Sequence, residues 1–291
     1  ANMVSAAIAL TNPATGDRLL VNGSAAASGT LASGVAWTRT DTAVTLSGSF
    51  TKAQYADAIE LVQFENTTDT PSTTPRTISV TVNDGISNSN TAIATINVTA
   101  VNDAPTATNL SAGETYTEDT ALNLTDIVAS DVDSANITAT LTLSNVGAGS
   151  LNTGTSGAVT STFVGGVWTA SGAIADVNAL LAGVTFTPTL NFNSNFTIAT
   201  SVSDGVAPAI TGVKAMTGTP VNDAPTATNL SAGETYTEDT ALNLTDIVAS
   251  DVDSANITAT LTLSNVGAGS LNTGTSGAVT STFVGGVWTA S

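Results

Sequence analysis

The fold of this chain is decided by an alternating stretch, NITATLTL at residues 136–143. Apolar residues occupy every second position of this stretch, and threonines occupy the positions between them. Because side chains of a strand point alternately to the two faces of a sheet, the pattern predicts a strand with one buried and one hydrated face. The same alternation at residues 196–202, 78–82 and 92–98 predicts three further strands.

Turn signals follow two of these strands. NDG stands at residues 83–85 and SDG at residues 203–205, each between two alternating runs. Asp-Gly in this position predicts a β-hairpin, because both residues tolerate the positive φ angles of a tight turn.

Period two is broken at residues 174–181 and 50–59, where apolar residues recur every three to four positions and predict a short helical turn. The other patterns predict about seven short strands per unit. The predicted fold class is therefore all-β, as tandem antiparallel Greek-key β-sandwiches. The predicted core residues are Leu122, Leu124, Ile127, Leu141, Leu143, Phe163, Trp168, Ile174, Leu180, Val184, Phe186, Phe196 and Ile198.

The chain is built from tandem repeats. Residues 101–171 return letter for letter at 221–291, a period of 120 residues. Solenoid repeats have periods of about 20 to 50 residues, so this period indicates a string of domains. We expect a partial unit at 1–100 that lacks its first strands, a complete unit at 101–220 and a partial unit at 221–291. Either the chain is a window on a longer polypeptide, which we favour, or neighbouring copies complete the partial units.

Each junction between units carries the sequence VNDAP, at residues 101–105 and 221–225. Proline fixes φ, lacks an N–H group and disfavours a helical conformation of the residue before it. The junctions are therefore predicted to be short, stiff and extended.

The composition limits the possible functions. The net charge is -18, from 23 acidic and 5 basic residues, and nucleic acids and anionic membranes need clustered Lys and Arg. The chain has no His and no Cys, which removes the commonest acid–base residue and all thiol chemistry. We therefore expect no enzymatic activity and no nucleic-acid partner. We also expect no membrane insertion, because no run of 18 apolar residues occurs.

Acidic and amide side chains gather at the predicted first junction. In a Greek-key sandwich of this kind, the loop after the second strand, which is expected at residues 121–129, and the last hairpin turn lie at the pole where the linker enters. Asn102 and Asp103 belong to the linker, Asp131 and Asp133 to the loop, and Asp204 to the turn. Calcium prefers six to eight oxygen ligands of this kind. The sequence predicts a calcium site, and the alternative is that these aspartates only form turns.

The pair Glu118 and Asp119 precedes the second strand of the complete unit and is expected at its opposite pole. There it either contributes to the second junction or caps a loop. The repeat supplies the linker and loop residues on the other side of that junction: Asn222, Asp223, Asp251 and Asp253.

The VNDAP linkers, TEDT at residues 117–120 and DVD at residues 131–133 resemble the cadherin-like repeats of very large bacterial surface and secreted proteins. The extender regions of RTX-type adhesins belong to this group, and residues 64–85 are also typical of it. The resemblance covers all three units.

The resemblance implies that calcium at the interdomain joints stiffens a rod. It matches Asn102 and Asp103 to the linker ligands, Asp131 and Asp133 to the loop pair, and Glu118 to the acidic residue near the start of a domain. The sequence departs from the pattern in two ways. Its linkers carry fewer acidic and amide positions than a cadherin linker, and residues 190–195 carry amides where many relatives have an aspartate.

We therefore expect structural extender repeats of a large adhesin or extracellular fibre on a bacterial cell surface. The expected partners are neighbouring repeats of the same chain, with self-association into fibres as a further possibility. The alternatives are a self-assembling filament or surface-layer subunit, and a polysaccharide-binding module. The last is disfavoured because only 4% of the residues are aromatic.

Overall fold

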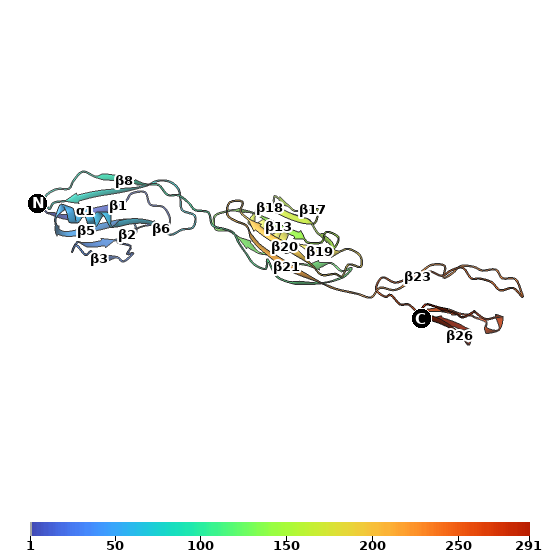
Figure 1. Ribbon diagram of the computed structural model, residues 1–291. Coiled ribbons are helices and arrows are strands. Elements are labelled where there is room, and N and C mark those ends of the chain that lie inside the picture. The colour runs from blue at the N-terminus through green and yellow to red at the C-terminus, as the bar shows by residue number, and fades with distance from the viewer. Residues whose placement is uncertain (1) are drawn as a thin grey trace.

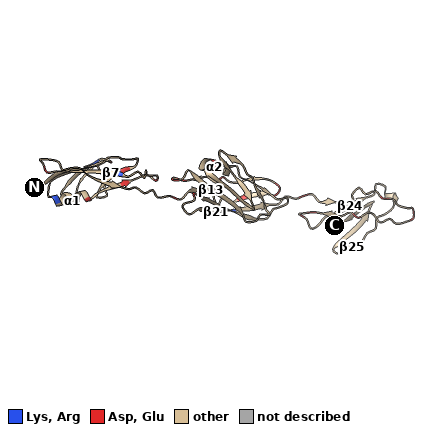
Figure 2. Cartoon of the chain, turned by 90° about the horizontal axis from the view of Figure 1, so that it is seen from above, with Lys and Arg blue, Asp and Glu red and all other residues tan. Residues whose placement is uncertain are grey.

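The computed structural model describes residues 2–291 as an elongated chain (Figure 1). Two compact bodies and a more open third follow one another in line, and the view from above shows the same line (Figure 2). The narrow connections lie in coil at residues 97–105 and 220–225, which include both VNDAP segments. Within residues 2–291, no helix is long and apolar enough to cross a membrane.

The first unit contains a six-stranded sheet, in the order β3-β4-β5-β1-β7-β8, and a two-stranded sheet of β2 and β6. Helix α1 (Lys52–Glu60) begins with a capping box, in which Thr51 and Gln54 bind each other's backbone N–H groups. The strands are β1 (Met3–Leu10), β2 (Asp17–Val21), β3 (Ser28–Thr30), β4 (Ala36–Arg39), β5 (Ala43–Phe50), β6 (Val62–Asn66), β7 (Arg76–Asn83) and β8 (Ala92–Ile96).

The second unit has a six-stranded sheet in the order β10-β21-β20-β13-β18-β17, and β11-β19-β14 form a second sheet. Helix α2 (Ile174–Ala182) contacts β13 and β18 of the large sheet. The strands are β9 (Thr106–Ala107), β10 (Glu114–Thr117), β11 (Leu122–Asn123), β12 (Ala129–Ser130), β13 (Asn136–Leu143), β14 (Gly149–Leu151), β15 (Thr155–Ser156), β16 (Val159–Thr160), β17 (Thr162–Val164), β18 (Val167–Ala173), β19 (Thr185–Pro188), β20 (Phe196–Ser203) and β21 (Ile210–Thr219).

The alternating pattern of the sequence sets the burial of β13 and β20. The apolar residues of β13 are buried, and its threonines lie on the opposite face. Trp168 is buried in the same core, and its indole N–H donates to the carbonyl of Asn152 over 3.0 Å. The predicted all-β sandwich is confirmed. Among the predicted core residues, the following are only partly buried, at the margin of the core: Leu122, Phe163, Ile174 and Leu180.

The second unit departs from the predicted antiparallel arrangement, because β10 pairs with β21 in parallel. The predicted strand at residues 121–129 is also wrong, because it is divided between β11 and β12, which lie in different sheets. Between them the N–H of Leu124 donates to the carbonyl of Val184, and the N–H of Thr125 donates to the side chain of Glu114. Such interruptions turn the expected seven strands into thirteen shorter ones, and each expected helical turn is a helix of 9 residues.

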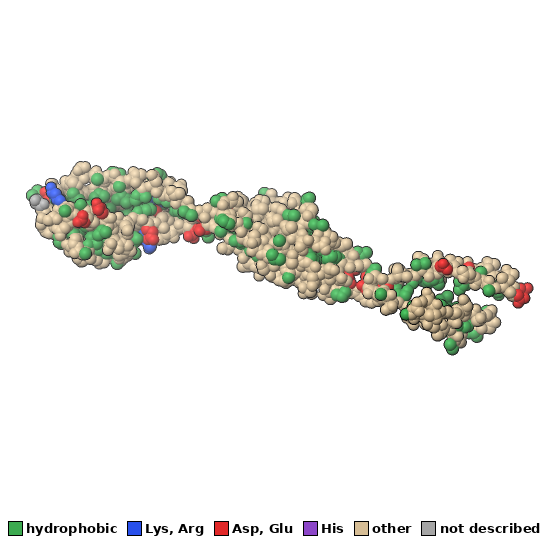
Figure 3. Space-filling view, in the orientation of Figure 1, with side chains coloured by type: hydrophobic (Ala, Val, Ile, Leu, Met, Phe, Trp, Pro, Cys, Tyr) green, Lys and Arg blue, Asp and Glu red, His purple; other side chains and the backbone are tan. Residues whose placement is uncertain are grey.

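Residues 221–291 have the same sequence as residues 101–171 but a more open structure. Tyr236 is 71% exposed, whereas its counterpart Tyr116 is 1% exposed. An open hollow of about 940 Å³, lined in part by Leu244 and Trp288, separates the two arms of this part (Figure 3). The elements are β22 (Thr226–Ala227), β23 (Ala249–Ser250), β24 (Ala259–Thr262), β25 (Thr275–Ser276), β26 (Val279–Val284), β27 (Val287–Ala290) and the 3-10 helix η1 (Val266–Ala268).

Candidate functional site

At the first junction, the linker, the 131–133 loop and the β20–β21 turn meet at one pole of the second unit. The side-chain amide of Asn102 donates to Oδ2 of Asp204 over 2.6 Å. The backbone N–H of Asp103 donates to Oδ2 of Asp133 over 2.5 Å. The structure therefore brings together the linker, loop and turn residues that the sequence singled out. Their role in metal binding stays a prediction.

Asp131 organises the loop at this junction. Its Oδ1 accepts hydrogen bonds from the N–H groups of Asp133 (2.9 Å) and Ser134 (2.7 Å), so the loop closes on the carboxylate. Its Oδ2 is buried and has no hydrogen-bond partner among residues 2–291. A buried carboxylate oxygen normally has a partner, so this oxygen is an exception.

Asp204 is held in its charged form. The hydrogen bond from the Asn102 side chain, and next the N–H of Val206, lower the pKa of the Asp204 carboxyl below its usual range. A charged, hydrogen-bonded aspartate at the pole adds negative charge to the junction.

At the second junction, Glu118 and Asp119 come from the far pole of the second unit, as expected. Glu118 is 1% exposed, and its carboxylate accepts hydrogen bonds from the N–H of Val221 and the side-chain amide of Asn193. Asp119 adopts a positive φ of 59° and accepts a hydrogen bond from the N–H of Asn191 over 2.9 Å. Glu118 is therefore bonded directly to the exit linker of its unit.

Asp223 lies on the other side of this junction, among carboxylates of both units. Burial raises the pKa of Asp223, and the negative charges of Asp253, Asp119, Glu118 and Asp251 raise it further. Its N–H donates to Oδ2 of Asp253 over 2.5 Å, and its Oδ2 is buried without a hydrogen-bond partner among the described residues. The second junction is therefore a place where like charges repel each other. Figure 3 shows acidic side chains at both narrow connections.

The side-chain amides of Asn102 and Asn222 also form hydrogen bonds within their own linkers. The side chain of Asn222 donates to the carbonyl of Asp223 over 2.7 Å, as Asn102 does to Asp103. These bonds stiffen the linker locally and leave the side-chain oxygen of each asparagine available.

The donor chemistry of both junctions fits a hard divalent cation, since all the side chains involved offer oxygen and two carboxylate oxygens lack partners. Within residues 2–291, however, no three acidic side chains lie close enough together to hold a metal ion as they stand. Binding therefore requires the carboxylates to draw together.

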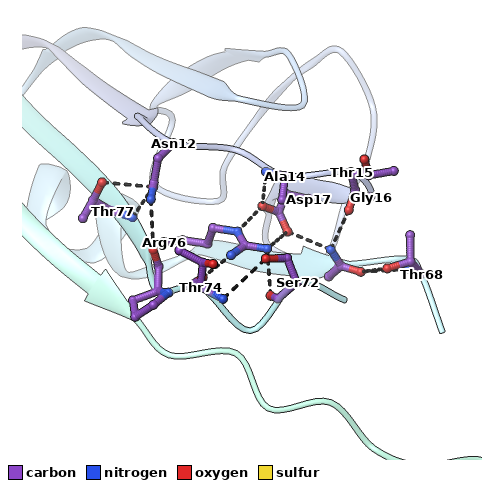
Figure 4. Close-up of polar contacts among 12 residues, drawn as sticks. Asn12, Ala14, Thr15, Gly16, Asp17, Thr68, Ser72, Thr74, Arg76 and Thr77 are labelled. Carbon is purple, nitrogen blue, oxygen red and sulfur yellow. Dashed lines mark hydrogen bonds and ion pairs between the residues drawn. The ribbon is translucent and has the colours of Figure 1, made fainter. Parts of the chain in front are cut away.

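The first unit contributes a different pair at its pole next to the first junction (Figure 4). The guanidinium of Arg76 binds the carboxylate of Asp17 and the carbonyls of Ser72 and Thr74, and both ionic side chains are almost fully buried. Arg76 lies at this pole because it pairs with Ile96, shortly before the linker. Burial raises the pKa of Asp17, but hydrogen bonds from Arg76, Ala14 and Asn66 outweigh it and hold the pKa below its usual value.

Sequence reasoning missed this pair, and it missed a second buried ion pair, Lys214 with Glu114. The positions of the basic residues along the predicted strands could have revealed both pairs. The chain has only 5 basic residues, and Arg76 and Lys214 both fall at alternating positions that point inward along a strand. A basic residue at an inward position of a strand requires a buried acidic partner.

Comparison with known proteins gives no family for this chain. No family model matches it, and no curated protein matches it. Among solved structures, human CDH23 EC21-23 has a TM-score of 0.34 at 17% identity, with 86% of this chain and 70% of that chain covered. Extracellular cadherin domains 3-6 of protocadherin gamma B2 have a TM-score of 0.34 at 13% identity, covering 94% of this chain and 59% of that one.

The titin domains z1z2 in complex with telethonin have a TM-score of 0.30 at 13% identity, covering 76% of this chain and 90% of that chain. Likeness at this level transfers neither ligand nor function. The all-β fold of this chain is therefore established by its own strand pairing.

Proposed function

We propose that this chain is a run of extender repeats from a large bacterial cell-surface or secreted protein, with junctions that calcium stiffens. The observation that carries the proposal is the position of Asp223. Its pKa is raised by burial and by the negative charges of four other carboxylates at the junction, and one of its oxygens is buried without a partner among the described residues. A divalent cation removes this repulsion and gives the oxygen a partner.

The residues that would hold calcium come from both sides of the second junction. Glu118 and Asp119 belong to the second unit, and Asp223, Asp251 and Asp253 belong to the third. When bound, the ion supplies a positive charge that ties carboxylates of two units together. The junction would then resist bending, because bending separates ligands of one ion.

The first junction would hold calcium more weakly. Its candidate ligands are Asp103, Asp131, Asp133 and Asp204, with Asn102, and all of them belong to the second unit. On the other side of this junction, the first unit offers the carboxylate of Asp17. The buried guanidinium of Arg76 already neutralises that carboxylate. We therefore expect the second junction to bind calcium first.

The test is calorimetric titration of the chain with calcium, together with small-angle X-ray scattering before and after saturation. We expect binding and a longer, stiffer particle. Asp223→Asn should weaken binding at the second junction, whereas Asp57→Asn, which removes the same charge from the exposed face of α1, should not. Titration without heat and scattering without change would refute calcium stiffening and leave a passive spacer.

Two alternatives are weaker. A polysaccharide-binding surface needs exposed aromatic rings, but the aromatic side chains of residues 101–220 are buried or partly buried, with Tyr116, Phe186 and Phe196 packed edge to face or tilted against one another. A self-assembling filament requires contacts between chains. Analytical ultracentrifugation of the same calcium-loaded sample separates this from a monomeric extender.

A further inference from the structure

The beginning and the end of the second unit are held side by side by a parallel strand pair. β10 and β21 pair in a register that places Thr117 opposite Thr219. The ladder continues with a 3.1 Å bond from the N–H of Glu118 to the carbonyl of Thr219. Next along the chain, the N–H of Val221 donates to the Glu118 carboxylate. β10, near the beginning of the unit, is thus bonded to the strand that precedes the second junction.

A buried ion pair joins the same two strands. Nζ of Lys214, on β21, lies 2.9 Å from Oε1 of Glu114 on β10 and 3.0 Å from the carbonyl of Thr125. The N–H and hydroxyl of Thr125 donate to the two oxygens of the Glu114 carboxylate, over 2.8 Å and 3.2 Å. The Lys214 and Glu114 side chains are 0% and 7% exposed. Water therefore cannot easily replace these bonds when the strands are strained.

Glycines on β21 allow the N-terminal segment to lie directly against it. A Cβ atom at Gly212 would lie 2.6 Å from the Cβ of Leu110, and one at Gly218 would lie 2.8 Å from the hydroxyl of Tyr116. Both distances are shorter than those that a Cβ atom keeps from atoms to which it is not bonded. The hydroxyl of Thr200, on the neighbouring strand β20, also donates to the carbonyl of Leu110 over 2.8 Å.

The direction of β10 and β21 determines how the pair responds to tension along the chain. Both run towards the second junction, since β10 ends beside Glu118 and β21 ends at the linker. Tension along the rod pulls β10 from its beginning towards the first junction and β21 from its end towards the second. The two strands must then slide past each other, and all their bonds carry the load together.

We infer that the β10–β21 pair, with the Glu114–Lys214 ion pair, is a shear clamp that allows the second unit to remain folded under tension. The inference rests on the proposed extender function only for the source of the tension. Neither Glu114 nor Lys214 is a proposed calcium ligand, and the stretching test is made without calcium, so the two ideas fail separately.

The first unit and residues 221–291 can be compared with the second unit in the same experiment, because neither contains the Glu114–Lys214 pair. In the first unit, Ala94 occupies the place of Lys214 in the 120-residue repeat, and β8 is an edge strand whose one neighbour is β7. In residues 221–291, Glu234 is the counterpart of Glu114 and forms no ion pair among residues 2–291. We therefore expect the second unit to be the last to unfold when the chain is stretched.

The test is single-molecule stretching of the whole chain without calcium. The chain has no cysteine, so Asn2→Cys and Ser291→Cys introduce unique attachment points. Unfolding of residues 101–220 should release about 400 Å of chain, at 3.3–3.6 Å per residue, and should occur at the highest force. In a second geometry, Asn2→Cys is combined with Val206→Cys, at a 73% exposed position in the turn before β21. Both strands are then pulled apart at the same pole, so their bonds break one after another at a lower force.

The ion pair is tested in both geometries. Lys214→Met should raise the unfolding rate at fixed force roughly tenfold or more when the chain is pulled by its ends, and much less in the second geometry. Lys52→Met, on the exposed face of α1, is the matched control and should change neither. If Lys214→Met does not fold, the double variant Glu114→Gln, Lys214→Met replaces it in the test, because it leaves no buried charge at this pair.

Equal unfolding forces in the two geometries would overturn the clamp. So would an equal effect of Lys214→Met in both, because that result indicates a general contribution to stability. A junction that does not respond to calcium, in a chain whose second unit still resists shear, would refute only the calcium proposal.

Discussion

Removing Arg76 should destabilise the first unit strongly, because it leaves the Asp17 carboxylate buried without its cation. The two side chains are 1% and 0% exposed, and Arg76 also binds the carbonyls of Ser72 and Thr74. In Arg76→Met, the carboxylate keeps only the hydrogen bonds from the N–H of Ala14 and the side chain of Asn66.

Breaking a buried ion pair from one side costs about 3–5 kcal/mol, and a domain of this size is stable by about 5–15 kcal/mol. With a urea dependence of about 2 kcal/mol per M, the unfolding midpoint of the first unit should fall by roughly 2 M. Arg18→Met is the matched control, since Arg18 and Glu65 form a pair whose side chains are 36% and 41% exposed. An exposed pair of this kind contributes about 1 kcal/mol or less.

The assay is urea unfolding followed by the fluorescence of Trp37, the one tryptophan of the first unit, after Trp168→Phe and Trp288→Phe. The pH dependence supplies a second readout. Because the pKa of Asp17 is lowered by folding, its contribution is present above the usual aspartate pKa of about 4 and is lost as pH falls through the folded value. The difference between Arg76→Met and the unchanged protein should therefore be largest near pH 7. A midpoint shift below about 0.5 M at pH 7 would refute the reasoning.

Three further predictions concern other parts of the chain. The pKa of Asp223 is raised in the folded chain, so repulsion at the second junction should ease as pH falls towards that value, and calorimetry should show calcium affinity falling over the same interval. Gly218→Val should destabilise the second unit by about 1–3 kcal/mol in urea unfolding, because the added Cβ would lie 2.1 Å from a backbone oxygen of Asn193. Trp168→Ala should cost about 3–5 kcal/mol by the same measurement, whereas Trp288→Ala, in the open third part, should cost far less.

The identical segments 101–171 and 221–291 separate what the sequence determines by itself from what the tertiary structure decides. Local features form in both. The turn with positive φ occurs at Asp119 and at Asp239, at 59° and 58°. Oδ1 of Asp251 accepts the same two N–H bonds as that of Asp131, at the same 2.9 and 2.7 Å. These contacts span two or three residues, so the local sequence is sufficient to specify them.

Sequence periodicity also specified the strands that carry most of the core. Alternation at residues 136–143 and 196–202 predicted β13 and β20 within a residue or two, because a half-buried strand needs one apolar face. The expected Greek-key connections, not periodicity, placed the linker, loop and turn aspartates at one pole. Trp168 was predicted in the core as the lone tryptophan of a small sandwich, and it is buried.

Tertiary structure alone decided the features that join distant parts of the chain. Tyr116 is buried and its hydroxyl donates to Ser194, whereas Tyr236, in the same sequence, is exposed. The parallel pairing of β10 and the partner of Glu114 likewise depend on β21, about 100 residues away. A sequence pattern reports which face of a strand is apolar. It does not report which distant strand will cover that face, since many strands have the same alternating pattern and the choice depends on the combined packing of the whole unit.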